Sequence, residues 1–387
     1  LIFEEKRSAT IIATSDSYSE DAVTTYSISK KLFLSLIDSK MMDIMRRKIQ
    51  LQNTNIQLQS LYFINYLGKG KFGSVFLVHN RDCIYALKAV SRNIVEKFKY
   101  LSNYYLSERR ILLSLDHPFI VKLVKTFKDD DYCYFLMENI NGISFEEYLI
   151  NRRNLNCQEE VTFYIATLLL IVQYLNSKSI IHRDIKPSNI MIESSGYLKM
   201  LDFGTAKVVF DYTTSIVGTP TYMAPEIISG MGYGLSPDYW SIGICAYEIF
   251  YNMLPFGENC EDPMEIYKSI LYDELTFPCR SSEYNQIEDF LNRILIKKVN
   301  QRECDLEKIK KYAVFENFKW DELIDFKMEP PFMPSTENLD DILLNTSSKL
   351  EIIMKNNFCS EKQDEERSFA EADSSYDDYN FKWAEEF

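Results

Sequence analysis

The chain has 387 residues, of which 46% are hydrophobic and 26% are charged, and its formal net charge is −14. This balance excludes collagen-like and wholly disordered chains and is typical of a soluble globular protein with more than one lobe. The acidic excess disfavours nucleic acid as a partner.

The eight cysteines show neither a CxxC pair nor the Cys/His spacing of a zinc site. They therefore indicate no disulfide framework and no structural metal, and we expect a reducing, cytoplasmic setting. The longest apolar runs, such as IATLLLIVQYL from Ile165, are too short to span a bilayer. No transmembrane segment is predicted.

Residues 7–37 contain two β-rich runs, SATIIA and TTYSIS, followed by a short helical pattern, KLFLSLI. A segment of about forty residues cannot bury a core alone. Because the sequence also begins inside a strand-like pattern, we expect residues 1–39 to complete a larger domain and the chain to be a fragment.

The next segments predict a linker and two lobes. Residues 40–60 carry good helix formers without Gly or Pro and predict a linker helix. Residues 61–140 alternate short strand patterns with one helical block, SERRILLSL, whereas residues 141–318 are mostly helical. The tail, residues 319–387, has little regular signal, and we expect it to run over the surface of both lobes.

The run LGKGKFGSV, from Leu67 to Val75, places three glycines between two predicted strands. Missing side chains there let backbone N–H groups approach phosphates closely, although a glycine-rich hairpin alone would look the same. The next strand carries Lys88, and the following helix carries Glu108. This arrangement suits a lysine that holds phosphates and a glutamate that holds the lysine.

The most informative stretch is HRDIKPSN, residues 182–189, which is followed by Asp202-Phe203-Gly204. Asp184 would receive or orient the proton of a substrate hydroxyl, and Lys186 would neutralise charge on a moving phosphoryl group. Asn189 and Asp202 would hold magnesium. Phosphoryl transfer needs positioning and charge neutralisation more than covalent chemistry, so this set is sufficient in kind.

Further motifs follow in a fixed order: Gly218-Thr219-Pro220, Ala224-Pro225-Glu226 and Asp238-Tyr239-Trp240, with Arg302 as the predicted buried partner of Glu226. Over residues 61–318 the sequence resembles the eukaryotic protein kinases. The resemblance implies an α+β, bilobal fold and transfer of the γ-phosphoryl of ATP, with Mg²⁺, to serine or threonine hydroxyls of protein substrates.

The same resemblance implies an ATP site between the lobes. Met137 falls at the gatekeeper position, Glu138 and Ile140 would contact adenine through their backbone groups, and Met191 would form the floor of the adenine pocket. The implied ATP-binding set is Leu67, Gly68, Lys69, Gly70, Lys71, Phe72, Gly73, Ser74, Val75, Ala86, Lys88, Glu108, Met137, Glu138, Ile140 and Met191.

Two regions resemble one group of these kinases, the AGC group. They are the segment WDELIDFKMEPPFMPSTENLDD and the closing KWAEEF, which resembles a truncated hydrophobic motif. Before the kinase, Arg7 and Ser8 in EKRSAT are similar to the end of a phosphate-binding cassette in a cyclic nucleotide-binding β-barrel, where an arginine pairs with the cyclic phosphate. A hydroxyl residue after that arginine is typical of cGMP-selecting sites. The resemblance therefore implies a cGMP-dependent protein kinase, most similar to protozoan members.

Alternatives remain open. Arg7 could belong to an ordinary strand hairpin, the kinase could respond to cAMP or be constitutive, or the chain could be a pseudokinase scaffold. The presence of Lys88, Glu108, Asp184, Asn189 and Asp202 argues against a scaffold. The sequence identifies neither the substrates nor the oligomeric state.

Basophilic members of the group bind an arginine that precedes the phosphorylated residue of the substrate, and they bind it through acidic side chains. At three of these acidic positions the present sequence has Ser144, Ser188 and Thr221. Of the usual acids Glu248 is kept, with Glu146 and Glu147 as nearby substitutes. Thr219 and Glu248 are the predicted substrate-binding residues, and we expect weak selection for arginine three residues before the acceptor.

The activation segment, VVFDYTTSIVGTP, has Ser215 where this group usually has threonine. Ser215 is therefore the predicted activation-loop phosphosite, with its phosphate paired to Arg183.

Overall fold

The computed structural model describes residues 29–36, 42, 45, 51, 55–70, 73–80, 83–97, 99–152, 157–278 and 285–335. The chain divides into two compact units, residues 1–56 and residues 57–387. In the first unit, helix α1 (Lys30–Leu36) confirms the helical pattern predicted there. Most of the predicted cyclic nucleotide-binding segment, with Arg7 and Ser8, lies outside the described residues.

The linker helix predicted over residues 40–60 was too long at its C-terminal end. Met42, Met45 and Leu51 are helical, but Asn55–Gln57 are not, and Leu58–Ser60 form a single 3₁₀ turn. Asparagine competes for its own backbone hydrogen bonds and favours turns over helix interiors. The helix therefore stops before the kinase begins.

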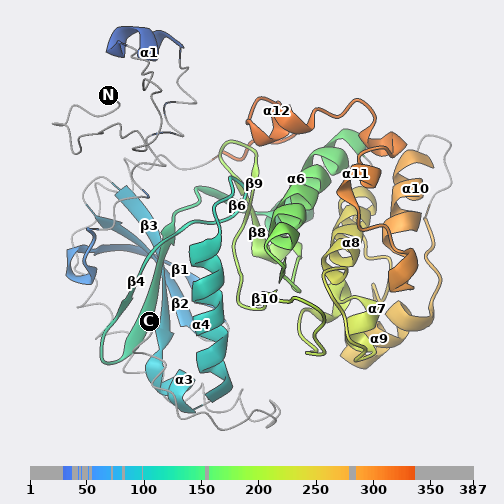
Figure 1. Cartoon of the computed structure of the whole chain (residues 1–387), viewed down its shortest axis with the longest axis horizontal. Coiled ribbons are helices and arrows are strands. Elements are labelled where there is room, and N and C mark those ends of the chain that lie inside the picture. Colours follow the sequence, from blue (N-terminus) through green and yellow to red (C-terminus); the bar gives the residue numbers. More distant parts are fainter. Residues whose placement is uncertain are drawn as a thin grey trace, which may run out of the picture. The chain divides into compact units, whose positions relative to one another are not determined.

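The N-lobe is a five-stranded antiparallel sheet in the order β1-β2-β3-β5-β4. Its strands are rich in aromatic and β-branched residues that alternate between the sheet faces, as strands with one buried face require. In Figure 1, α4 runs beside this sheet, and it also contacts β10 of the other lobe. The elements are β1 (Tyr62–Gly70), β2 (Gly73–Asn80), β3 (Cys83–Ser91), α3 (Arg92–Lys97), α4 (Lys99–Ser114), β4 (Leu123–Lys128) and β5 (Tyr132–Glu138).

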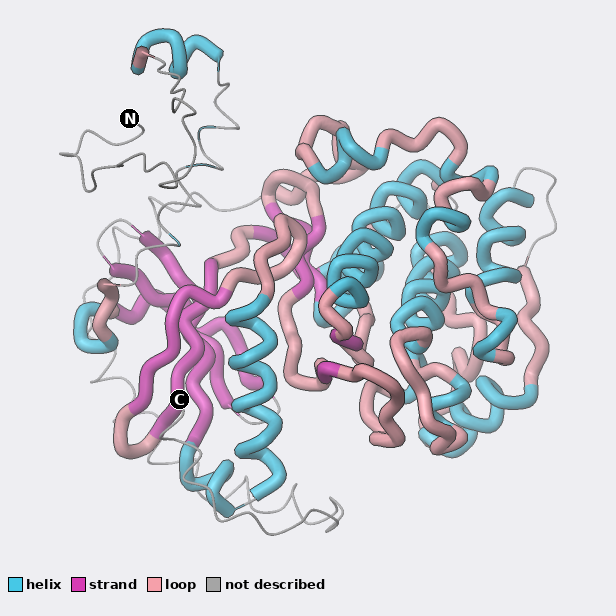
Figure 2. Tube along the Cα trace, in the orientation of Figure 1, coloured by secondary structure: helices cyan, strands magenta, loops and turns pink. Residues whose placement is uncertain are grey.

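The C-lobe is mainly helical, with two small sheets near the sheet lobe, as Figure 2 shows by colour. Its helices are α5 (Phe145–Asn151), α6 (Gln158–Ser177), α7 (Pro225–Ile228), α8 (Pro237–Tyr251), α9 (Pro263–Tyr272), α10 (Asn285–Ile294), α11 (Leu306–Ile309) and α12 (Trp320–Ile324). Its strands are β6 (Gly142–Ser144), β7 (Ile180–Ile181), β8 (Ile190–Glu193), β9 (Leu198–Met200) and β10 (Lys207–Val208).

Helix α6 is the centre of this lobe. Among the described residues it is the one helix long and apolar enough to cross a membrane, yet 72% of its most apolar window is buried inside the fold. An apolar helix covered on nearly all sides is typical of the core of a large soluble domain. Helix α8, which packs beside α6, is buried over most of its length in the same way.

The described start of the tail packs on the C-lobe. The ring of Phe326 contacts the rings of Phe119 and Tyr197, and the Tyr197 hydroxyl donates a 2.6 Å hydrogen bond to the Met328 carbonyl. Phe332 packs against Tyr148 with 4.6 Å between ring centroids. The KWAEEF segment lies outside the described residues.

Candidate active site

The described glycines of the glycine-rich segment lie at the paired ends of β1 and β2, where Gly70 pairs with Gly73 and Gly68 with Val75. A Cβ built on Gly73 would overlap the Ala89 carbonyl of β3, so the close approach of these strands requires glycine there. Lys71 and Phe72 lie outside the described residues. The described part of the predicted phosphate loop therefore consists of the paired ends of β1 and β2, and β2 lies next to the strand that carries Lys88.

Lys88 lies on β3 and forms a 2.6 Å ion pair with Glu108 of α4. The structure thus confirms the contact suggested by their spacing. Burial opposes the charge on Lys88, but the carboxylates of Glu108 and Asp202 outweigh it and raise the pKa of the lysine above its ordinary value. Lys88 therefore keeps its positive charge near neutral pH.

Asp184 is the centre of a connected polar cluster. Its Oδ1 accepts a 2.7 Å hydrogen bond from the Thr219 hydroxyl, and its Oδ2 accepts a 3.0 Å bond from the Asn189 amide. Lys186 Nζ lies 3.1 Å from Oδ2 of Asp184 and 2.5 Å from the Thr219 hydroxyl. Three predicted residues thus converge on the Asp184 carboxylate: Lys186 and Asn189 from the same loop, and Thr219 from 35 positions further along the chain.

Asn189 and Asp202 have the donor chemistry that Mg²⁺ prefers. The Asn189 amide nitrogen is used by Asp184, which leaves its amide oxygen for a metal. Burial opposes the charge on Asp202, but Lys88 and the Gly204 N–H, 2.9 Å from Oδ1, lower its pKa below the ordinary value. No three His, Cys, Asp or Glu side chains converge as a metal site in the described residues.

The residues predicted to contact adenine lie on the hinge, Glu138 to Ile140, which begins at the last residue of β5, and on neighbouring strands. Met137 pairs with Ala86 across β3 and β5, and Met191 of β8 pairs with Ser144 of β6, the strand that follows the hinge. Ile140 is buried.

An ion pair that the sequence did not predict connects the hinge to strand β9. Lys199 of β9 lies 2.7 Å from Oε1 of Glu138, and the same oxygen accepts a 2.9 Å hydrogen bond from the Lys122 N–H. Burial, and then the Lys199 charge, lower the pKa of the neighbouring His117 to about 4. A lysine flanked by apolar residues just before Asp202 was the available sequence signal.

The loop that carries Asp184 is held by a buried acid. Asp238 accepts hydrogen bonds from the backbone N–H groups of His182 and Arg183, at 2.7 and 2.8 Å. Arg183 adopts a φ of 71°, a left-handed conformation that side chains rarely take. Both bonds stabilise this strained residue, and strain of this kind is typical of functional sites.

The activation segment brings Ser215 into a basic, hydroxyl-rich site. Lys207 Nζ donates a 2.9 Å bond to the buried Thr213 hydroxyl, which lies 3.3 Å from the Ser215 hydroxyl. Burial and the charge of the Arg183 guanidinium both lower the pKa of Lys207. Tyr233 bridges Arg183 and the Ser215 carbonyl. Sequence reasoning identified Ser215 and Arg183 but missed Lys207, Thr213 and Tyr233.

The predicted Glu226–Arg302 pair is confirmed as a buried, two-point contact. The distances from Nη1 to Oε1 and from Nη2 to Oε2 are 2.6 and 2.8 Å. The bidentate geometry fixes the end of the activation segment to the loop before α11.

Glu248 is the acid predicted to bind substrate side chains. Burial raises its pKa to about 7, Glu258 and Glu146 act in the same direction, and a 2.7 Å bond from the Tyr222 hydroxyl acts against them. Ser144 instead caps α5 by accepting a bond from the Glu147 N–H.

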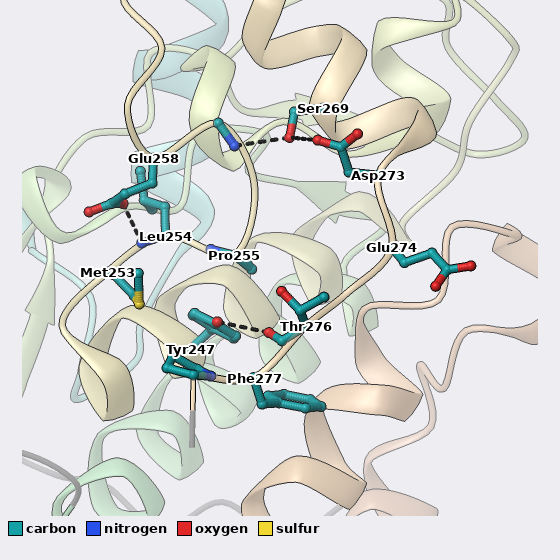
Figure 3. Close-up of a pocket in the computed structure, with 12 residues that line it drawn as sticks. Tyr247, Met253, Leu254, Pro255, Glu258, Ser269, Asp273, Glu274, Thr276 and Phe277 are labelled. Carbon is teal, nitrogen blue, oxygen red and sulfur yellow. Dashed lines mark hydrogen bonds between the residues drawn. The ribbon is translucent and has the colours of Figure 1, made fainter. Parts of the chain in front are cut away.

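A separate pocket of about 570 Å³ lies in the C-lobe between the ends of α8 and α9 (Figure 3). Two of its acids take partners within the pocket wall, because Glu258 accepts a bond from the Leu254 N–H and Asp273 accepts one from Ser269. The Tyr247 hydroxyl donates to the Thr276 carbonyl at 2.9 Å. None of the predicted site residues lines this pocket.

The geometry agrees with what comparison to known proteins finds. The family model described as protein kinase domain matches residues 62–315. A cGMP-dependent protein kinase of Plasmodium berghei is 37% identical over 343 residues, which are 87% of this chain and 39% of that protein. One from Eimeria tenella is 36% identical over 87% of this chain and 33% of its own length.

The chain therefore spans less than half the length of these cGMP-dependent relatives. The human cAMP-dependent protein kinase catalytic subunit PRKX is 31% identical over 72% of this chain and 77% of its own length. Together with the confirmed pairs Lys88–Glu108 and Glu226–Arg302, these matches show that the chain belongs to the protein kinase family.

Proposed function

We propose that the chain transfers the γ-phosphoryl of ATP to serine or threonine hydroxyls of proteins. The observation that carries the proposal is the convergence of Thr219, Asn189 and Lys186 on the Asp184 carboxylate. A substrate hydroxyl beside this carboxylate would be oriented, and its proton accepted, as transfer proceeds. Lys186 would neutralise charge on the phosphoryl group, and Lys88 would hold the remaining phosphates.

Asn189 and Asp202 are the residues that would hold magnesium. The ion would supply charge neutralisation at the phosphates and would help to orient them. Lys88, whose pKa is raised, and Asp202, whose pKa is lowered, both keep their charges near neutral pH. The protein thus presents one fixed cation and one fixed anion to the Mg²⁺–ATP complex.

The test is to incubate the chain with Mg²⁺–ATP and a library of Ser, Thr and Tyr peptides, and to locate new phosphate by mass spectrometry. Phosphate on serine or threonine supports the proposal. Phosphate on tyrosine alone, or none on any peptide, contradicts it.

We also propose regulation by cyclic nucleotide, with cGMP as the ligand. Support comes from the similarity to cGMP-dependent kinases of Plasmodium berghei and Eimeria tenella, and from Arg7 and Ser8 in the cassette-like EKRSAT. A cAMP-responsive kinase is the second candidate, since PRKX is also similar. The ligand would act by favouring a released, active state.

The discriminating experiment extends the chain at its N-terminus with the native upstream sequence and compares activation by cGMP and cAMP. We expect cGMP to activate at lower concentration, and Ser8→Ala to reduce that preference while leaving basal activity unchanged. Equal responses to both nucleotides would contradict cGMP selection.

A further inference from the structure

The glycine of the Asp202-Phe203-Gly204 turn lies directly against a tyrosine of α4. A Cβ built on Gly204 would overlap the Tyr104 hydroxyl and would lie only 2.7 Å from Tyr104 Cζ. Real side chains do not approach so closely. The space that any larger residue at position 204 would need is therefore filled by Tyr104.

Backbone conformation does not explain the glycine. The described glycines with positive φ are Gly196, Gly218, Gly230 and Gly257, and Gly204 is not among them. Alanine could adopt the backbone angles of Gly204 without left-handed strain. The contact with Tyr104 is thus the specific obstacle to a side chain there.

Tyr104 precedes Glu108 by four residues in α4, so both side chains lie on one face of the helix, one turn apart. Glu108 holds Lys88, and Tyr104 touches the turn that carries Asp202. Burial raises the pKa of Tyr104, and the charges of Asp202, Glu108 and Asp184 act in the same direction.

The turn is held from its other side as well. Phe203 is fully buried, and its ring packs edge-to-face on His182 with 4.9 Å between centroids. Asp202 accepts the Gly204 N–H at 2.9 Å, which closes the turn. With Phe203 fixed in the C-lobe core, Tyr104 is the contact through which α4 limits the movement of Gly204.

We propose that Tyr104 is a positioning residue that couples the placement of α4 to that of the metal-binding Asp202, by filling the space beside Gly204. When α4 is placed so that Glu108 holds Lys88, Tyr104 keeps the turn in the conformation that presents Asp202. This inference rests on the proposed kinase activity.

The test enlarges the residue at position 204 and shortens the residue at position 104, singly and together, in the full chain. Gly204→Ala alone should lower kcat/KM by about 100-fold, since small misplacements of catalytic groups cost this much. Leucine at position 104 has no atoms beyond Cδ, so the Tyr104→Leu variant leaves room beside Gly204. In that variant, Gly204→Ala should lower kcat/KM by less than about 5-fold, far less than in the wild-type background. An equal loss in both backgrounds would overturn the proposal.

A matched control uses Tyr174, a half-buried tyrosine of α6 whose hydroxyl accepts the Asp116 N–H. Tyr174→Ala should not rescue Gly204→Ala, because general loosening of the fold does not clear space at position 204. Rescue by this control would contradict the specific contact. If Tyr104→Leu fails to fold, Tyr104→Phe, which removes only the hydroxyl, should give partial rescue, and its absence would count against the proposal.

A second readout separates positioning from simple stability. Tyr104→Leu should raise the Mg²⁺ concentration needed for half-maximal activity and leave the KM for the peptide unchanged, whereas an unchanged Mg²⁺ requirement would overturn the coupling. Thermal stabilisation by Mg²⁺–ATP is measured in parallel. If the wild type binds Mg²⁺–ATP but phosphorylates nothing, the kinase proposal fails. The effects of Gly204→Ala with and without Tyr104→Leu can then still be compared through the affinity for Mg²⁺–ATP.

Discussion

Lys199 and Glu138 form a 2.7 Å ion pair with both side chains largely buried, and this pair joins the strand before Asp202 to the hinge. Removing one partner of such a pair leaves an uncompensated charge, which is more damaging than removing both. The hinge conformation is therefore tied to the segment that leads into the metal-binding turn.

Lys199→Met should lower the free energy of unfolding by on the order of 3 kcal/mol, because it removes a short ion pair from a largely buried carboxylate. Adding Glu138→Gln should recover at least half of that loss, since glutamine can still accept the Lys122 N–H. Urea denaturation measures both. The matched control is Lys319→Met, whose exposed pair with Glu322 should contribute less than about 1 kcal/mol. Equal effects of Lys199→Met and Lys319→Met would contradict the buried pair.

Glu248→Gln should make stability less dependent on pH. The pKa of Glu248 is about 7 in the folded protein against an ordinary value of 4.5, so the folded state binds the proton more tightly. Wild-type stability should then fall as pH rises from 4.5 to 7, and the loss should be complete above pH 7.

The glutamine variant should therefore be the more stable protein at pH 8, by on the order of 1–3 kcal/mol, and should match the wild type near pH 4.5. Thermal denaturation across this range checks the prediction. A stability difference that does not change with pH would count against the raised pKa.

Ser215→Ala should lower kcat/KM by about 10- to 100-fold, since a phosphate at this position would form charge-assisted bonds with Arg183 and Lys207. Phosphopeptide mapping and peptide kinetics measure this effect. Thr214→Ala is the control, because Thr214 is exposed beside the site and should be silent. Unchanged activity and phosphate content in Ser215→Ala, without compensation by Thr213 or Thr214, would refute the phosphosite.

A peptide array should show weak selection for arginine three residues before the acceptor, because Ser144, Ser188 and Thr221 supply no carboxylate. Ser188→Glu should increase that selection severalfold. Ser188 is exposed, so an added charge there requires no burial. Strong selection by the unmodified chain would contradict the prediction.

The sequence predicted the bilobal fold and the residues around Asp184 because motifs such as HRDIKPSN combine fixed spacing with distinctive chemistry. It also predicted the Glu226–Arg302 pair, which the structure confirms. Contacts without such a motif were missed. Lys199 and Glu138, like Tyr104 and Gly204, meet only through the fold, and no local periodicity indicates pairing between distant positions.

The linker helix shows a different limit. Composition without Gly or Pro suggested helix as far as residue 60, but weak helix propensity around Asn55 and the start of the sheet at Tyr62 end it earlier. Helix boundaries depend on such local competition, which a composition window averages away.

The central claim is that Asp184 serves phosphoryl transfer, and the most direct measurement compares wild type with Asp184→Asn. Both proteins should be stabilised by Mg²⁺–ATP to the same extent, while the variant's rate of serine or threonine phosphorylation should fall by about 100- to 10,000-fold. Equal rates for the two proteins, or nucleotide binding with no phosphorylation by the wild type, would contradict the account.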